Sequence, residues 1–330
     1  MLSLETLRYV LVLLGVPGVL CCLAQAPAGP DTSELMPCRP VIAPERAYSL
    51  KLTSFVPEPN RVSGALLDAR IDGGPPVHLL LDSGAAHITL DAKASARSGI
   101  AAVSESHLVG MGGSPARPVR SGVAGAVDVG PLRFGNCQVD MAPGRLAEGT
   151  DGVIPLSLFG GFLMRLELPG KALDLMPYPD RAAIPTAGFA RAILRNDMLF
   201  VRGAMNDSQE GYILLDTGAS YSAISRRTAQ ALNSSPVSAV GLRGANGALD
   251  GDLIAAAVRF HVGGWNLTAD SVVALDLAEF SAFNGVETAG VLGYPALRAS
   301  VLTISYRDAM VRIETPPKGE HGRAQMAERR

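Results

Sequence analysis

The chain has 330 residues, a formal net charge of −2 and 48% hydrophobic residues. A charge balance this close to neutral, with no basic stripe along the sequence, gives no electrostatic basis for binding nucleic acid. The length suits two domains of about 130 residues or one large bilobal domain. The 36 glycines and 23 prolines, among many Val, Leu and Ile residues, favour short strands and tight turns, so we expect an all-β protein.

The N-terminal segment carries the only long apolar stretch of the sequence, residues 7–24. Small residues near its end offer cleavage sites, and the Pro17-Gly18 pair disfavours a stable membrane-spanning helix. We therefore expect residues 1–28 to be a secretory signal peptide and the protein to be exported, either to the periplasm or out of the cell. The alternative is an uncleaved segment that anchors the protein to the inner membrane, because the stretch is barely long enough to span it.

Residues 29–47 are rich in proline and polar residues and are predicted to be a loose leader. Once a signal peptide is removed, Cys38 and Cys137 are the only cysteines left. In an oxidising compartment they could form a disulfide between the leader and the first half of the chain. Two unpaired thiols are the equally open alternative, since nothing in the sequence places these residues close together.

Predicted strands follow in chain order, and the same order occurs twice. In each half, apolar segments alternate with turns rich in Gly, Pro, Asn or Asp, and the last segment is a short, continuous apolar run. The predicted strands are residues 48–55, 62–71 and 77–81 in the first half and 192–194, 199–204 and 212–215 in the second. Short helices are expected at residues 91–98 and 226–232.

A break in composition at residues 177–185 separates the two halves. The predicted organisation after the leader is a first lobe at residues 48–178, a linker at 179–187, a second lobe at 188–315 and a polar tail at 316–330. The tail is charged and lacks periodicity, so we expect it to be frayed.

An internal repeat is the strongest signal in the sequence. Residues 77–90 read VHLLLDSGAAHITL and residues 212–225 read YILLDTGASYSAIS, so an apolar run precedes Asp-Ser-Gly in one and Asp-Thr-Gly in the other. One such triplet arises by chance in about one chain of this length in five. Here the similarity continues beyond the triplets, as an internal repeat should. It pairs residues 109–113 with 240–244, 127–130 with 260–263 and 152–156 with 290–294.

A tandem repeat in which each half supplies one Asp in a D-[ST]-G turn resembles the aspartic proteases of the pepsin and retropepsin families. The resemblance covers residues 48–315, most of the chain. It implies two homologous β-barrel lobes with a cleft between them, a protein or peptide substrate cut next to apolar residues, and no cofactor or metal ion. Because both lobes belong to one chain, we expect a monomer.

The resemblance implies an aspartic endopeptidase with Asp82 and Asp216 as its catalytic pair. Like charges a few ångströms apart cannot both ionise, so the two carboxyl groups would share one proton, as in known aspartic proteases. The pair could then activate a water molecule and protonate the carbonyl of the substrate.

The residues after each Asp are expected to support the two active-site loops. Ser83 and Thr217 carry hydroxyl groups that can hydrogen-bond across the junction of the loops. Gly84 and Gly218 allow close approach of the backbone and donation of their N–H groups to the carboxylates.

One segment departs from the family pattern. The family places a hydrophobic-hydrophobic-Gly segment beside each Asp loop, and residues 291–293 fit it, whereas residues 153–155 end in Pro155. Proline lacks the N–H and fixes φ, so the support of the first Asp loop is expected to differ. A catalytically weak or inactive peptide-binding protein with the same cleft is therefore the second hypothesis.

Glycine-rich segments occupy corresponding places in both halves and resemble the two flaps of retropepsins, and neither contains the Tyr of the single pepsin flap. The expected substrate-binding flap residues are Gly110, Met111, Gly112 and Gly113 in the first half and Gly241, Leu242 and Gly244 in the second. Two ordinary hairpin turns are the alternative, because Gly-rich turns are common in all-β chains.

Other site chemistries find no support in the sequence. The five His residues are scattered and no H-E-x-x-H motif occurs, which argues against a zinc site. The G-x-S-x-G motif of serine hydrolases is also missing. We interpret His87, five residues after Asp82, as a packing or surface residue rather than a cleft residue.

Overall fold

The computed structural model of the chain describes residues 38–41, 45–112, 116–180, 187–234, 236–244, 247–254, 257–270 and 272–315, and for residues 239–250 only the backbone. These residues belong to one compact unit, Leu35–Arg330. The predicted signal peptide, most of the predicted linker, the predicted tail and the flap residue Gly113 lie outside the described residues. Among the helices in the described part, none is long and apolar enough to cross a membrane.

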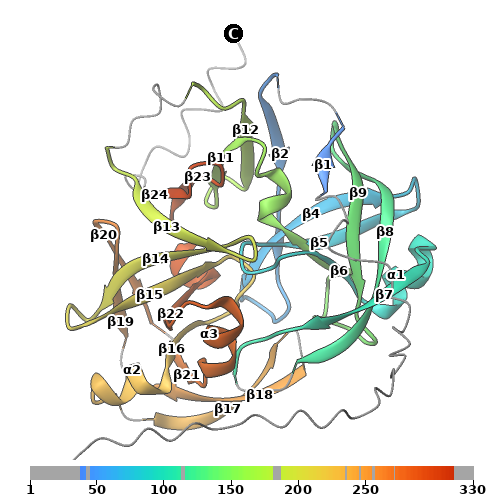
Figure 1. Ribbon diagram of the computed structural model, residues 1–330. Helices are drawn as coiled ribbons and strands as arrows, with labels where there is room; N and C mark the ends of the chain where they lie inside the picture. Colours follow the sequence, from blue (N-terminus) through green and yellow to red (C-terminus); the bar gives the residue numbers. More distant parts are fainter. Residues whose placement is uncertain are drawn as a thin grey trace, which may run out of the picture. The chain divides into compact units, whose positions relative to one another are not determined.

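Strands dominate the described residues and form two sheets, which confirms the all-β prediction (Figure 1). The first sheet contains β1 (Arg39–Pro40), β3 (Thr53–Phe55), β4 (Gly64–Ile71), β5 (Pro76–Asp82), β6 (Ile88–Leu90), β7 (Ala102–Leu108), β8 (Arg117–Val129), β9 (Leu132–Met141) and β10 (Gly152–Pro155). The second sheet contains β2 (Tyr48–Lys51), β11 (Leu163–Glu167), β12 (Ala172–Met176), β13 (Ala190–Arg195), β14 (Met198–Met205), β15 (Gln209–Asp216), β16 (Ser222–Ser225), β17 (Pro236–Gly244), β18 (Gly247–Ile254), β19 (Val258–Val262), β20 (Trp265–Ala269), β21 (Val272–Leu275), β22 (Thr288–Gly293), β23 (Val301–Ser305) and β24 (Met310–Glu314). The helices are α1 (Ala92–Ser98), α2 (Arg226–Ala231), α3 (Ala278–Asn284), α4 (Tyr294–Leu297) and the 3₁₀ helix η2 (Leu156–Phe159).

A six-stranded section of the second sheet joins the two halves of the chain. Its strand order is β2-β12-β11-β23-β24-β13, so each half contributes three strands. The central strands β11 and β23 are antiparallel, with Arg165 opposite Thr303. Counted outward from this centre, both halves contribute their strands in equivalent order, as expected of two repeats related by a pseudo-twofold axis.

Strand pairing corrects one element that the sequence predicts as continuous, the strand at residues 48–55. In the structure β2 ends at Lys51 and pairs with β12, whereas β3 starts at Thr53 and pairs with β4 in the other sheet. The segment therefore passes from the section shared by both halves into the sheet of the first half.

The two predicted helices lie where the sequence places them, each after an Asp loop. Asp91 caps α1, because its Oδ1 accepts the N–H of Ala94 at 2.7 Å. Ser225 caps α2 in the same way, and its Oγ accepts the N–H of Thr228 at 3.0 Å. These caps satisfy N–H groups that have no partner within the first turn of a helix.

The apolar runs before the two Asp residues form buried strands. Leu79 and Leu81 of β5 are 0% and 1% exposed, and Ile213 and Leu215 of β15 are likewise 0% and 1% exposed. A parallel strand lies beside each run, β10 beside β5 and β22 beside β15. Each Asp is thus held at the end of a strand that the core fixes in place.

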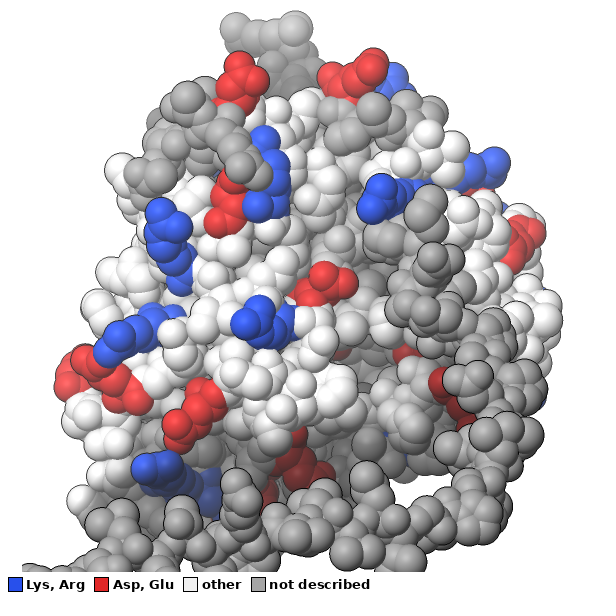
Figure 2. All heavy atoms as spheres, viewed as in Figure 1, with Lys and Arg blue, Asp and Glu red and all other residues white. Residues whose placement is uncertain are grey.

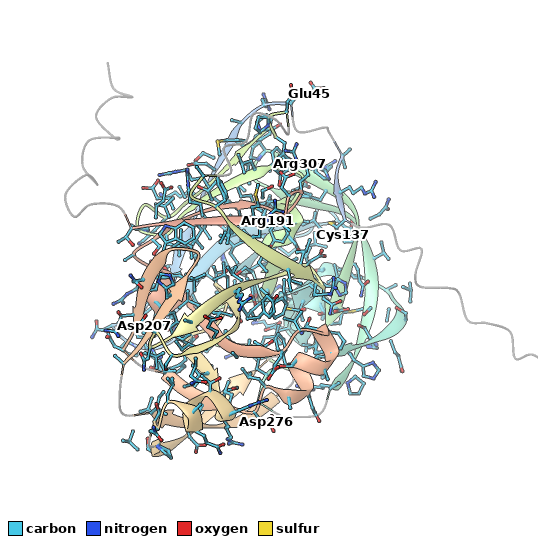
Figure 3. All side chains as sticks on the ribbon, turned by 60° about the vertical axis from the view of Figure 1, so that its left-hand side comes forward. Glu45, Cys137, Arg191, Asp207, Asp276 and Arg307 are labelled. Atoms are coloured by element: carbon cyan, nitrogen blue, oxygen red, sulfur yellow. A yellow bond between two sulfur atoms is a disulfide. The ribbon has the colours of Figure 1, made fainter. Side chains whose placement is uncertain are left out.

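A disulfide between Cys38 and Cys137 ties the leader to the first half, so the two cysteines are paired (Cys137 is labelled in Figure 3). The strand β1, which lies within the predicted leader, pairs antiparallel with β9, with Arg39 opposite Gly135. Arg39 and Pro40 therefore form a short strand at the edge of the first sheet. In the chain-entropy model, closing a loop of 99 residues stabilises a fold by about 4–5 kcal/mol.

Candidate active site

The two predicted catalytic residues end equivalent strands and meet between the halves of the chain. Asp82 is the last residue of β5 and Asp216 is the last residue of β15. Parallel pairing places Pro155 beside Asp82 and Gly293 beside Asp216. The carboxyl groups of the two Asp residues are in hydrogen-bond contact with each other.

A reciprocal set of hydrogen bonds joins the two Asp loops through Ser83 and Thr217. The Ser83 hydroxyl donates to the carbonyl of Leu215 at 2.8 Å, and the Thr217 hydroxyl donates to the carbonyl of Leu81 at 2.9 Å. Each hydroxyl also accepts the backbone N–H of the other residue, at 3.0 and 3.1 Å. Four buried hydrogen bonds therefore fix the position of one loop relative to the other.

The glycines after the two hydroxyl residues leave room for the carboxylates. A Cβ atom on Gly84 would lie 2.7 Å from Cγ of Asp216, and a Cβ atom on Gly218 would overlap the carboxylate of Asp82. Their N–H groups donate to the Asp of their own loop, Gly84 to Asp82 Oδ1 at 2.6 Å and Gly218 to Asp216 Oδ1 at 2.9 Å. Only glycine permits this approach of each loop to the opposite carboxylate.

The electrostatics of the pair favour one shared proton. Burial raises the pKa of Asp82 well above its ordinary value and the charge of Asp216 raises it further, against the N–H groups of Gly84 and Gly218. Burial also raises the pKa of Asp216, although hydrogen bonds from Asp82 and from two backbone N–H groups oppose the shift. The pair therefore holds one shared proton, so it presents an acid and a base side by side.

Pro155 fits the first Asp loop without backbone strain. Its φ is −69° and its ψ is 138°, which lie within the range that the proline ring allows. Gly293, its counterpart, is also extended, with φ −84° and ψ 171°. The departure from the family pattern therefore removes an N–H group but does not change the path of the chain.

The predicted first flap crosses to the second half of the chain. Gly110, Met111 and Gly112 follow β7, and the N–H of Gly112 donates to the carbonyl of Asp276 at 3.0 Å. The side chain of Met111 packs against an apolar cluster of the second half that includes Phe280. This hairpin segment thus reaches across from the half that carries Asp82.

The predicted second flap forms the end of the hairpin of β17 and β18. Gly241, Leu242 and Gly244 lie on β17, and Gly244 pairs with Gly247 next to the turn. Both glycine-rich segments therefore belong to long hairpins. Contact of either hairpin with a substrate remains a prediction.

The fifth residue after each Asp holds a matching place in the repeat, and sequence reasoning did not single out the one in the second half. In the first half this residue is His87, whose Nδ1 lies 3.3 Å from the buried carboxylate of Asp140. In the second half it is Tyr221, whose hydroxyl accepts a hydrogen bond from Arg61 Nη1 at 2.6 Å. Their matching places in the repeat were a usable signal, but their partners come from strands and loops distant in sequence.

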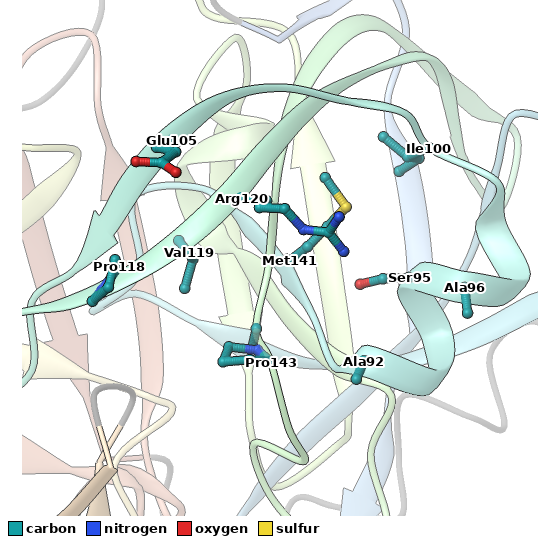
Figure 4. A pocket seen from close by; sticks show the side chains of 11 residues that line it. Ala92, Ser95, Ala96, Ile100, Glu105, Pro118, Val119, Arg120, Met141 and Pro143 are labelled. Atoms are coloured by element: carbon teal, nitrogen blue, oxygen red, sulfur yellow. The ribbon is translucent and has the colours of Figure 1, made fainter.

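A surface pocket lies away from the Asp pair, between α1 and the hairpin of β7 and β8 (Figure 4). It has a volume of about 480 Å³ and is lined in part by Glu105, Arg120 and Met141. No residue that the sequence predicts for the site lines it. We place the candidate site at the carboxyl pair, because two buried acids meet there with the geometry of a proton-sharing couple.

Metal and polyanion binding find no support in the described residues. Among them, no group of three or more His, Cys, Asp or Glu side chains could hold a metal ion. Figure 2 shows acidic and basic side chains interspersed on the face in view. The described part of this face therefore carries no extended field of one sign. Ion pairs among the described residues, such as Arg202 with Glu210 at 2.8 Å, also offset charge.

Comparison with known proteins adds two findings to this geometry. The sequence model of the family described as "Aspartyl protease" matches residues 67–158 and 201–296, so each matched segment contains one Asp of the pair. The crystal structure of the aspartic proteinase from Irpex lacteus is similar to this chain at 12% identity and a TM-score of 0.48, and the match covers 82% of this chain and 98% of that one. No curated protein matches the sequence significantly.

Proposed function

Because this chain belongs to the aspartyl protease family, we propose that it is an endopeptidase that hydrolyses peptide bonds with Asp82 and Asp216. The observation that carries the proposal is the buried carboxyl pair, held in contact by the reciprocal hydrogen bonds of Ser83 and Thr217. Burying two acids side by side costs free energy. Buried acids with strongly shifted pKa values are typical of catalytic sites.

The chemistry assigns a different part to each carboxyl group. Ionised Asp216 takes a proton from a water molecule as the water oxygen attacks the peptide carbonyl carbon, and protonated Asp82 donates its proton to the carbonyl oxygen. When the tetrahedral intermediate collapses, the C–N bond breaks and the leaving nitrogen takes the proton now held by Asp216. A hydroxyl proton of the intermediate returns to Asp82, so the pair regains its single proton.

Cleavage of a mixed peptide library by the purified protein tests the proposal, with wild type and Asp216→Asn assayed side by side from about pH 3 to pH 8. We expect cleavage by the wild type and a loss of at least about 10⁴-fold in the variant, because Asn cannot act as the base. Full activity in Asp216→Asn would refute the catalytic pair. Peptide binding without cleavage by a folded wild-type protein would favour the second hypothesis, a catalytically weak or inactive peptide-binding protein.

We propose the location and the oligomeric state of the protein on separate grounds. Export is supported by the apolar N-terminal stretch at residues 7–24 and by the Cys38–Cys137 disulfide, since disulfides persist in oxidising compartments. A monomer is supported by the presence of both Asp residues in one chain. Sedimentation of the active protein as an obligate dimer would contradict that state.

A further inference from the structure

The two flanks of the carboxyl pair are closed by contacts between the halves, and the contacts differ in charge. The pseudo-twofold relation places His87 and Tyr221 on opposite sides of the pair. A loop of the first half brings Arg61 to Tyr221. The turn between β13 and β14 of the second half brings Asp197 near His87, and the two side chains interact electrostatically.

The flank at Tyr221 carries a fixed positive group. The Arg61 guanidinium lies over the Tyr221 ring, 4.0 Å from its centroid, and Nη2 donates to the carbonyl of Ser220 at 3.1 Å. Glu58 is 3.4 Å away but is itself 64% exposed, so it screens the charge only in part. With 31% of its side chain exposed, Arg61 remains open to solvent beside the pair.

The flank at His87 carries two carboxylates around one imidazole. Asp140 is 3% exposed, and its burial by itself would raise its pKa. Hydrogen bonds from His87, Ser121 and Gln138 outweigh this effect, so the pKa of Asp140 is lowered. Asp140 is therefore ionised and orients the imidazole, which is 43% exposed. In the first half Asp140 pairs with Thr89, and in the second half Val273 pairs with Ala223, the residue equivalent to Thr89. Val273 therefore occupies the place of Asp140, and the second half has no charge there.

The turn that presents Asp197 is anchored on both sides. Asn196 Nδ2 donates to Asn284 Oδ1 at 3.0 Å, and Asn284 is buried at the end of α3. Met198, on the other side, is 4% exposed in the apolar cluster of the second half. Asp197 itself is exposed, and it interacts electrostatically with the buried Tyr306, which also interacts with Asp82.

From this asymmetry, and resting on the proposed function of the same cleft, we infer that the protein selects its peptide by charge order. A basic side chain of the peptide lies at the flank of His87, Asp140 and Asp197, and an acidic side chain lies at the flank of Arg61. Asp197 is the residue that contacts the basic side chain, because it is exposed while Asp140 is buried. This adds charged neighbours to the apolar residues that the family resemblance leads us to expect around the cleaved bond.

Two peptides of identical composition test the inference. Both have an apolar pair at the centre, one with Lys before and Glu after it and the other with the order reversed, so that net charge is matched. Binding to the Asp216→Asn protein is measured by fluorescence anisotropy near pH 7 and low salt. We expect one order to bind about 5- to 10-fold more tightly, and Asp197→Asn in the same background to remove most of that ratio.

Asp207→Asn is the matched control. Asn206-Asp207 forms a turn like that of Asn196-Asp197, with φ values of 48° and 57° against 46° and 59°, and Asn tolerates this conformation well. Asp207 lies in the next hairpin, paired with Arg259 at 2.8 Å (Figure 3), so its substitution should leave the binding ratio unchanged. Equal binding of the two peptides, binding of neither, or a ratio that survives Asp197→Asn would overturn the inference. A clear ratio in a protein whose wild type cleaves nothing would instead overturn the proposed hydrolysis and leave the charge order standing.

Discussion

The two Asp loops share their polar contacts across the junction but differ in the strand beside each carboxylate. In the second half, the N–H of Gly293 donates to Ser222 Oγ at 3.1 Å. In the first half, Pro155 has no N–H to donate, and the residue at the place of Ser222 is Ile88, which is 2% exposed in the core. The second half therefore pairs the N–H of Gly293 with a hydroxyl acceptor. The first half has neither the N–H nor the hydroxyl, so neither half buries an unpaired polar group here.

This comparison separates what the carboxyl pair requires from what each half can change alone. The hydroxyl and glycine residues contact the opposite loop, so a change in one half disturbs the other. The strand beside each Asp pairs only with strands of its own half. Divergence is therefore tolerated there as long as donor and acceptor change together, and Pro155 by itself gives no structural reason to expect an inactive site.

Among changes that leave both Asp residues in place, the largest effect is expected from adding a methyl group to the glycines of the two loops. Gly84→Ala and Gly218→Ala each place Cβ against the opposite carboxylate, which must move the pair apart. We expect kcat/KM to fall by about 100-fold or more in either variant, because small misplacements of catalytic groups are costly. Peptide cleavage measures the effect. Gly144→Ala is the control, since no atom lies within 4 Å of its added Cβ; equal activity in all three variants would contradict the tight contact.

A smaller effect is expected from breaking the donor and acceptor match in one half at a time. Ser222→Ala leaves the Gly293 N–H without its partner, and we expect the free energy of unfolding to fall by about 1–3 kcal/mol. Pro155→Gly should also lower the free energy of unfolding, because it adds an N–H group opposite the apolar Ile88 and raises the conformational entropy of the unfolded chain. Adding Ile88→Ser to Pro155→Gly supplies the acceptor.

Urea denaturation of these variants gives the coupling energy directly. A favourable coupling between Pro155→Gly and Ile88→Ser supports the match described above. Strictly additive effects would show that the two positions do not interact, and that the difference between the halves has another cause.

Local patterns predicted the parts of the site that lie close to each Asp. The apolar runs, the D-[ST]-G turns and the short helices are short-range features, and the repeat showed which of them belong together. The six-stranded section was not predicted, because the pairing of Arg165 with Thr303 joins segments far apart in the chain. The disulfide was left open for the same reason, since it depends on the pairing of β1 with β9.

The contacts of Arg61, Asp197 and Tyr221 were not predicted because they depend on packing between the halves. Arg61 and Asp197 lie in turns whose sequences give no sign of the partner they meet. His87 was interpreted as a packing or surface residue, and its contact with Asp140 shows that a buried acid on a neighbouring strand orients it. Asp140 itself lies in a strand where the repeat has Val273, a difference that becomes visible only once the strand register is known.

The smallest effect expected is a difference in pH-dependent stability between the two Asp residues. The pKa of Asp82 is raised well above 3.8 in the folded protein, so its protonated form contributes stability that is present at low pH and is lost as pH rises through the folded pKa. Asn stays neutral, so the stability of Asp82→Asn relative to wild type should increase with pH above about 4, by at most about 1.4 kcal/mol per pH unit. The same series for Asp216→Asn should show a shallower increase, because hydrogen bonds oppose the rise of its pKa. Thermal or urea unfolding at several pH values measures both, and equal slopes would contradict the assignment of the shared proton to Asp82.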